Sequence, residues 1–460
     1  MSEAVSQDPR LLDNQGIAGH PRGLMVLFFT EMWERFSYYG MRALLVLFLV
    51  APKAKGGLGF TIVEATAIYS TYTMSVYLAS LPGGFVADRW LGQRKAIPLG
   101  GILIALGQFI LAASSNAAVF YGGLGVIVVG TGLLKTNCAT MAGAIYADND
   151  SRRDAGFSIY YMGVNLGALI APLICGFLAQ DPRFLGFLSR LGLATESGWR
   201  WGFGAAGVAM VLGTIQFMVQ QHKFGEAGLK PGFQSVEHGH SSTQEPLNAE
   251  EKKRLWVIAI LFVFSVIFWA TYEQAGSSLN LFADRFTRSQ ILGFSFPSTW
   301  FQSVNSAWLL MLAPLISWLW VKWGDRGPSS PLKFAFGLLF VGLGMLLLVP
   351  AARIALGGSR VAPWWLIGTF GLHTVGELCL SPVGLSTTTK LAPARYQGLM
   401  MGVWYLSLAI GNKLAGKVAG LFETMPLTRI FGSLFLATAS AAVVLVILTP
   451  SIKRLMGGVK

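Results

Sequence analysis

Twelve long apolar stretches, separated by short polar segments, follow one another along the chain. Each is long enough to cross the roughly 30 Å hydrocarbon core of a bilayer as an α-helix. Their approximate bounds are residues 24–50, 60–87, 96–115, 117–147, 156–179, 199–221, 255–284, 293–321, 333–351, 363–390, 396–421 and 429–451. The pattern predicts an all-α polytopic membrane protein with twelve transmembrane helices.

The longest polar interruption lies between the sixth and seventh stretches and is rich in Gly, Pro, Ser and His. It predicts an N-terminal six-helix bundle (residues 1–222), a linker (223–254) and a C-terminal six-helix bundle (255–460). Of the 35 Lys and Arg residues, twenty lie on the side of the N-terminus, ten on the opposite side and five within predicted spans. Because cytoplasmic loops carry the excess of Lys and Arg, we expect both termini and the linker in the cytoplasm.

The first stretch carries an unusual amount of charge, since residues 30–42 read T-E-M-W-E-R-F-S-Y-Y-G-M-R. Four uncompensated charges inside the hydrocarbon would cost roughly 10 kcal/mol. Steps of three and one residues place six polar side chains on one helix face: Glu31, Glu34, Arg35, Tyr38, Tyr39 and Arg42. The spacing predicts an ionisable stripe that faces a cavity, with an apolar stripe toward lipid or protein. The alternative is that these charges only pair and hold two helices together.

Three further charges lie well inside later stretches: Lys135 in the fourth, Glu273 in the seventh and Glu377 in the tenth. Cations therefore dominate the predicted N-terminal bundle, whereas the C-terminal one supplies the two carboxylates, with Lys413 and Lys417 near the outer end of the eleventh stretch. This distribution suits a substrate with a negative and a positive end, such as an amino acid or a peptide. A carboxylate near a cation in an alternately opening cavity is also a candidate proton carrier. Static pairing between helices is the alternative for each of the three.

The composition narrows the class of protein further. Only 12% of residues are charged, against about 25% in soluble domains, and 55 are Gly, which favours close helix packing. The net charge of +13 is dispersed over short loops, so it does not indicate a nucleic-acid partner. The three Cys residues are too scattered for a metal site, and no G-x-x-x-x-G-K-[ST] loop predicts an ATP-driven pump. We expect no enzyme activity, no metal, no cofactor and no obligatory protein partner, and a lipid bilayer as surroundings.

Four motifs together resemble the proton-dependent oligopeptide transporter family of the major facilitator superfamily. They are E-M-W-E-R-F-S-Y-Y-G on the first helix, F-S-I-Y-Y-M-G-V-N-L-G-A on the fifth, W-A-T-Y-E-Q-A-G-S-S on the seventh and G-E-L-C-L-S-P-V-G-L-S on the tenth. The loop G-G-F-V-A-D-R-W-L-G-Q-R-K resembles the superfamily's cytoplasmic loop signature, with a weaker echo in V-K-W-G-D-R-G. The resemblance implies a symporter in the cell inner membrane that imports di- and tripeptides with protons by alternating access. The peptide would bind between two bundles near the membrane midplane.

The resemblance also assigns roles to residues. It implies a proton-coupling set, in which Arg42 pairs with Glu273 toward the outer side: Glu31, Glu34, Arg35, Arg42 and Glu273. The peptide carboxylate would meet Arg35, Tyr39 and Lys135, and its amino end Asn165, Asn305 and Glu377, with Lys135 opposite Glu377. Side-chain pockets would be lined by Tyr38, Tyr77, Trp269, Ser381 and Trp404. From the residues alone, core packing is an equal alternative for each aromatic side chain.

The chain departs from the family pattern in three places. The second stretch holds no His, so proton coupling would depend on carboxylates. The linker has no room for the two extra helices of many bacterial members, and Ser306 replaces the proline that follows the family's eighth-helix asparagine. Two functional alternatives stay open: transport of another anionic solute, such as nitrate or an amino-acid conjugate, and a membrane-embedded enzyme or receptor.

Overall fold

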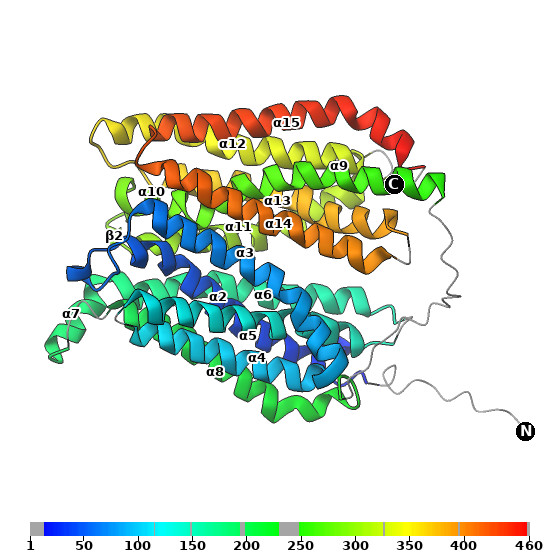
Figure 1. Ribbon diagram of the computed structural model, residues 1–460, viewed down its shortest axis with the longest axis horizontal. Coiled ribbons are helices and arrows are strands. Elements are labelled where there is room, and N and C mark those ends of the chain that lie inside the picture. Colours follow the sequence, from blue (N-terminus) through cyan, green and yellow to red (C-terminus); the bar gives the residue numbers. More distant parts are fainter. Residues whose placement is uncertain are drawn as a thin grey trace, which may run out of the picture. The chain divides into compact units, whose positions relative to one another are not determined.

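The computed structural model describes residues 13–114, 116–147, 150–193, 198–229, 248–324, 327–393 and 396–457. Long helices make up nearly all of this part of the chain (Figure 1). Twelve have 21 or more residues: α2 (Gly23–Val50), α3 (Ile62–Val86), α4 (Gln93–Ala113), α5 (Ala117–Ala144), α6 (Arg153–Gln180), α8 (Gly198–Gln220), α9 (Ala249–Tyr272), α11 (Phe301–Trp323), α12 (Ser330–Leu356), α13 (Trp364–Leu391), α14 (Gln397–Ala419) and α15 (Leu427–Leu455). The all-α prediction is confirmed.

Nine helical segments of the described chain are long and apolar enough to cross a membrane. Helices α2, α3 and α14 do not meet that criterion. Helix α2 falls short because its centre carries the four charges discussed above. The side chains from Thr30 to Leu49 are nonetheless buried or half-buried, so the apolar stripe of this helix packs on protein.

Shorter elements join the long helices at several points. Helix α7 (Pro182–Arg190) lies between α6 and α8, and helix α10 (Ser278–Phe286) follows α9. Strands β1 (Gln290–Ile291) and β2 (Phe294–Ser295) pair antiparallel. Helix α7 and the two strands were not predicted, whereas α10 lies largely within the seventh predicted span, residues 255–284. The seventh predicted helix, expected as one span over residues 255–284, is interrupted by the 3-10 turn η6 (Glu273–Gly276).

The segment that resembles the superfamily signature, residues 83–95, starts in the last turn of α3 and continues through a π-helical turn, η3 (Ala87–Leu91). Within it the Asp88 carboxylate accepts a hydrogen bond from Gln93 Nε2 at 3.0 Å. The corresponding Asp325 and Arg326 of the weaker echo lie outside the described residues, as do residues 230–247 of the predicted linker.

The chain divides into two compact units. Unit 1 comprises Met1–Met41, Ala79–Ala179 and Arg183–His240, and unit 2 comprises Arg42–Leu78, Gln180–Pro182 and Ser241–Lys460, each in its described parts. Helices α2 and α3 therefore contribute one end to each unit.

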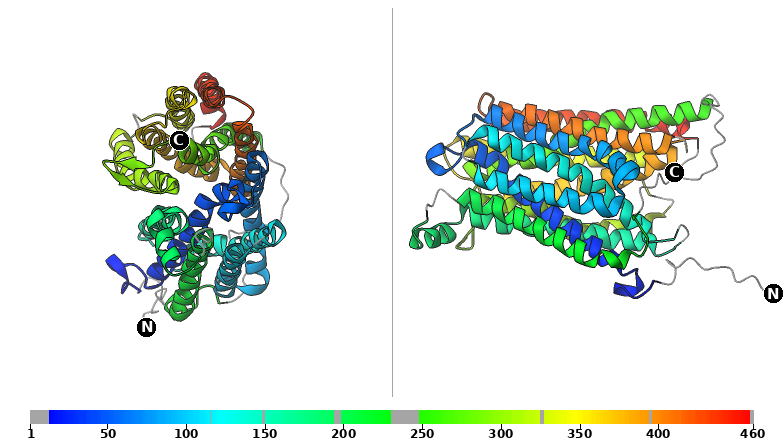
Figure 2. Two further views of the ribbon diagram at one scale, coloured as in Figure 1. Left: turned by 90° about the vertical axis from the view of Figure 1, so that its left-hand side faces the viewer. Right: turned by 60° about the horizontal axis from the view of Figure 1, so that its bottom comes forward.

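Helix α4 packs along both α5 and α8 in unit 1, and these helices lie side by side in both figures (Figures 1 and 2). Glycines bring the backbones of α4 and α5 together. A Cβ atom added at Gly100 would lie 2.6 Å from the carbonyl oxygen of Gly130, and one at Gly130 would lie 2.7 Å from that of Gly100. Substitution at either position would force the two helices apart.

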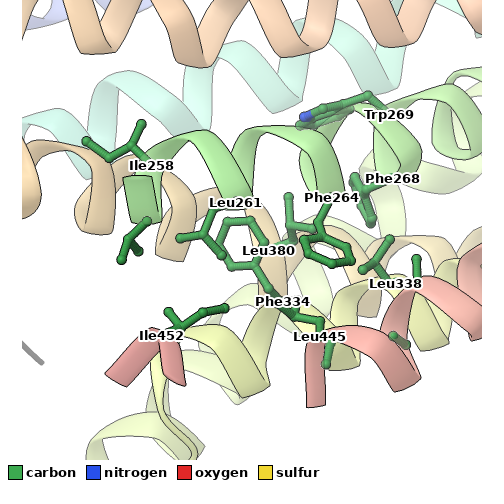
Figure 3. Close-up of a cluster of buried hydrophobic side chains, with 14 of the residues drawn as sticks. Ile258, Leu261, Phe264, Phe268, Trp269, Phe334, Leu338, Leu380, Leu445 and Ile452 are labelled. Carbon is green, nitrogen blue, oxygen red and sulfur yellow. The ribbon is translucent and has the colours of Figure 1, made fainter. Parts of the chain in front are cut away.

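A hydrophobic cluster in unit 2 is formed by side chains of α9, α12, α13, α14 and α15 (Figure 3). Phe268, Phe334 and Leu380 are fully buried in it. Truncating one such side chain to Ala typically costs about 2–5 kcal/mol. The cluster gives the polar side chains of α9 and α13 a rigid support.

A polar cluster ties the segment before α2 to the loop between α5 and α6. His20 Nδ1 lies 2.8 Å from the Tyr146 hydroxyl, and Arg152 donates to the Gly19 carbonyl oxygen at 2.7 Å. Hydrogen bonds from Arg152 lower the pKa of Asp150, and burial raises the pKa of Tyr146 to about 12. Asp150 therefore stays ionised and bonded to Arg152 at every pH above its lowered pKa.

Candidate functional site

The charges of α2 within unit 1 form one buried cluster. The Arg35 guanidinium donates to both Glu34 oxygens, at 2.7 Å for Glu34 Oε1, and its Nε lies 3.4 Å from Glu31 Oε1. All three residues are at most 5% exposed. Three charges this deeply buried would be very costly unpaired, so the bidentate contact and the second carboxylate are what allow them there.

Tyr160, from α6, completes this cluster. Its hydroxyl donates to Glu31 Oε2 at 2.7 Å. Helix α6 comes this close because two of its glycines face α2. A Cβ atom at Gly163 would lie 2.7 Å from the Phe28 carbonyl oxygen, and one at Gly167 would overlap the carbonyl oxygen of Met32. Both glycines, like Tyr160, belong to the motif on this helix that resembles a family signature.

Among the predicted substrate-contacting residues of unit 1, Tyr38 and Tyr39 lie next to Arg35. The Arg35 guanidinium carbon lies 5.0 Å from the ring centre of Tyr38 and 6.0 Å from that of Tyr39, both within cation–π range. Lys135 is half-buried on α5, close enough to interact electrostatically with Glu31. Asn165 is buried and donates to the Tyr161 carbonyl oxygen of its own helix at 2.9 Å.

A second ion pair, in unit 2, joins Arg42 of α2 to Glu273. This is the contact that the family resemblance implied, and both side chains are buried. The Arg42 Nε also donates to the Tyr69 hydroxyl, and the guanidinium carbon lies 5.7 Å from the centre of that ring. A Cβ atom at Gly276 would overlap the Tyr69 hydroxyl, so glycine is required there. Glu273 is the first residue of η6, so the ion pair lies at the break in the seventh predicted helix.

A polar group around Glu377 lies between α9, α11 and α13. The Tyr272 hydroxyl donates to Glu377 Oε2 and lies 3.2 Å from Asn305 Oδ1. The Asn305 amide nitrogen in turn donates to the Thr374 hydroxyl at 2.9 Å. Ser381, one helical turn beyond Glu377 on α13, is half-buried. Glu377 and Asn305, predicted together at the peptide's amino end, are thus bridged by one tyrosine.

The predicted aromatic pocket residues of unit 2 pack on the hydrophobic cluster of Figure 3. Trp269 and Trp404 are members of that cluster, and Tyr77 packs against it. Glycines fix both indoles. A Cβ atom at Gly411 would lie 2.5 Å from the Trp269 Cβ, and one at Gly384 would overlap the Trp404 ring. Both tryptophans therefore pack in the hydrophobic cluster, and their role in a side-chain pocket stays a prediction.

Two tyrosines at these sites were not predicted. Tyr160 and Tyr272 each donate to a carboxylate on another helix. Both stand inside motifs that resemble the family's signatures, and Tyr272 directly precedes Glu273. Arg35 and Lys135 belong to unit 1 and Glu377 to unit 2, so their meeting at one peptide stays a prediction. Among the described residues, no group of three or more His, Cys, Asp and Glu side chains is arranged to hold a metal ion.

Comparison with known proteins identifies relatives over almost the whole chain. The family model described as the POT family matches residues 94–237 and 234–436. The peptide transporter YePEPT of Yersinia enterocolitica is 37% identical, with 95% of this chain and 96% of the relative covered. A di-/tripeptide transporter of Lactococcus lactis subsp. cremoris is 33% identical, with 96% of this chain and 98% of the relative covered.

The fold is similar to that of solved transporters. The crystal structure of a variant of a peptide transporter POT in complex with alafosfalin superposes with a TM-score of 0.87 at 36% identity. The match covers 97% of this chain and 98% of the solved one. The similarity confirms the predicted polytopic helical transporter fold.

Proposed function

Because the chain belongs to the POT family of membrane transporters, we propose that it imports di- and tripeptides in symport with protons. Alternating access of two six-helix bundles, residues 1–222 and 255–460, would carry the peptide across. We place the protein in the cell inner membrane with both termini and the linker 223–254 in the cytoplasm. The twofold excess of Lys and Arg on the side of the termini supports this orientation.

The observation that carries the proposal is the buried cluster of Glu31, Glu34 and Arg35 with Tyr160. One guanidinium faces two carboxylates, so the cluster tolerates a proton on one carboxylate while the other keeps the ion pair. A proton bound there changes the net charge of the cluster by one, which alters the attraction for a peptide carboxylate at Arg35. Linking the proton to the peptide in this way is what symport requires.

The second support is the pair of Arg42 and Glu273, which bridges α2 and the break after α9. An ion pair that forms in one state of a cycle and opens in another is a gate. Protonating Glu273 would remove its charge and release Arg42. We therefore assign Glu273 and Arg42 to the coupling set together with the α2 cluster.

In the proposed site, Arg35, Tyr39 and Lys135 bind the peptide carboxylate, and Asn165, Asn305 and Glu377 bind its amino group. The polar group around Glu377 supports the second half of this assignment, since the Tyr272 hydroxyl contacts both the Glu377 carboxylate and the Asn305 oxygen, and these two acceptors suit an ammonium ion. Tyr38, Tyr77, Trp269, Ser381 and Trp404 would line the side-chain pockets.

Uptake by proteoliposomes tests the proposal. Purified protein is reconstituted, and labelled dialanine, trialanine, tetraalanine and nitrate are offered with and without an inward acid gradient. We expect gradient-dependent accumulation of dialanine and trialanine only. Accumulation of nitrate in place of the peptides would favour the alternative of another anionic solute, and accumulation of dialanine without a gradient would contradict proton coupling.

A further inference from the structure

Tyr272 occupies a special place in unit 2, as the last residue of α9 before the helix breaks at η6. The residue after it, Glu273, turns toward Arg42, whereas the Tyr272 side chain turns toward α11 and α13. Two adjacent residues, Tyr272 and Glu273, therefore take part in two separate polar sites. Helix packing alone does not explain the hydrogen bonds of the Tyr272 hydroxyl.

The ring of Tyr272 is held on two sides by aromatic neighbours of its own helix. It stacks on Phe268 with 5.6 Å between ring centres and 20° between planes, and it meets Trp269 edge-on at 5.3 Å. Phe268 and Trp269 are both buried in the hydrophobic cluster of unit 2. The position of the hydroxyl is therefore fixed by packing before any hydrogen bond forms.

The hydroxyl reaches two acceptors, Glu377 Oε2 and Asn305 Oδ1. Asn305 presents its oxygen there because its amide nitrogen donates to Thr374. A phenol has one proton, and the shorter contact is to the carboxylate, so that proton goes to Glu377 Oε2. One oxygen of Glu377 is thereby fixed in position, and this sets the direction in which the carboxylate faces a ligand.

We propose that Tyr272 is a positioning residue that orients the Glu377 carboxylate to bind the ammonium group of a peptide. The inference rests on the proposed function of Glu377. Tyr272 does not touch the peptide in this account; it acts through the carboxylate. Its removal should therefore weaken binding only for ligands that carry a free amino group.

The experiment measures the affinity of reconstituted protein by inhibition of dialanine counterflow, which requires no proton gradient. We expect Tyr272→Phe to weaken dialanine binding about tenfold, equivalent to about 1.4 kcal/mol. The affinity for N-acetyl-dialanine should be unchanged. In a Glu377→Gln background the second substitution should have no further effect, because the carboxylate that it orients is gone. The matched control is Tyr405→Phe on α14, which we expect to bind dialanine like the wild type.

Two outcomes would overturn the inference: a wild-type affinity of Tyr272→Phe for dialanine, or an equal loss for the acetylated peptide. If Tyr272→Phe does not fold, 3-fluorotyrosine at position 272 retains the ring and makes the hydroxyl a stronger donor. Its dialanine affinity should then change at least twofold, only when Glu377 is present, and an unchanged affinity would overturn the inference. A wild-type protein that fails to bind dialanine would instead contradict the proposed function.

Discussion

The buried pair of Arg42 and Glu273 offers a sharp test of how this protein tolerates charge inside the membrane. Arg42 is 8% exposed and Glu273 is 3% exposed. Removing one partner of such a pair leaves an uncompensated charge and costs about 3–5 kcal/mol. The substitutions Arg42→Leu and Glu273→Leu, alone and together, separate the cost of an orphaned charge from the contribution of the pair itself.

The size of the effect on thermal unfolding follows from chain length. An unfolding entropy of about 2.1 cal/mol/K per residue over 460 residues gives about 1 kcal/mol/K. Each single substitution should therefore lower the unfolding midpoint by about 3–5 °C. The double substitution should recover at least half of that loss, because replacing both charges by apolar side chains removes the desolvation cost.

The chain contains its own control for this experiment. Arg285 and Glu423 form an ion pair at 3.3 Å with both side chains exposed. Exposed pairs contribute about 0–1 kcal/mol, so Arg285→Leu should move the midpoint by about 1 °C or less. The assay is thermal unfolding of purified protein in detergent. The reasoning is refuted if Arg42→Leu shifts the midpoint no more than Arg285→Leu, or if the double variant is as unstable as the sum of the single ones.

Three further predictions concern unit 1. Glu34→Gln should abolish gradient-driven dialanine uptake while sparing counterflow, and full uptake by this variant would exclude Glu34 from coupling. Lys135→Ala should eliminate uptake of dialanine but leave the uptake of its C-terminal amide at the wild-type level, whereas normal dialanine uptake would remove Lys135 from the site. Gly167→Ala should cost about 1–3 kcal/mol, measured by thermal unfolding, because its Cβ would overlap the Met32 carbonyl oxygen; an unchanged midpoint would show that α6 shifts freely.

Hydropathy predicted the helices of this fold well, because a bilayer demands about twenty apolar residues per span. The first stretch, expected over residues 24–50, is α2, Gly23–Val50. The break at Glu273 was not predicted, because this stretch was interpreted as one continuous span. The contacts formed at the break, between Glu273 and Arg42 and between Gly276 and Tyr69, are tertiary contacts that hydropathy does not detect. Helix α7 was missed because nine amphipathic residues are too few to give a spanning signal.

The candidate site was predictable in its charges but not in its hydroxyls. A buried ion in a membrane helix is costly, so each one stands out in the sequence. A tyrosine is common in apolar stretches, and its spacing does not indicate whether its hydroxyl contacts a carboxylate on another helix. The hydrogen bonds of Tyr160 and Tyr272 to carboxylates could therefore be found only in the structure. For Trp269 and Trp404, the sequence likewise did not reveal that both side chains pack in the hydrophobic cluster of unit 2.

The most direct test of the central claim is the proton flux that accompanies peptide entry. Proteoliposomes loaded with a pH-sensitive dye, and clamped electrically with potassium and valinomycin, receive external dialanine at equal internal and external pH. The account predicts acidification of the lumen that depends on dialanine and is absent from Glu34→Gln. Dialanine entry at the wild-type rate with no change in lumenal pH would contradict it.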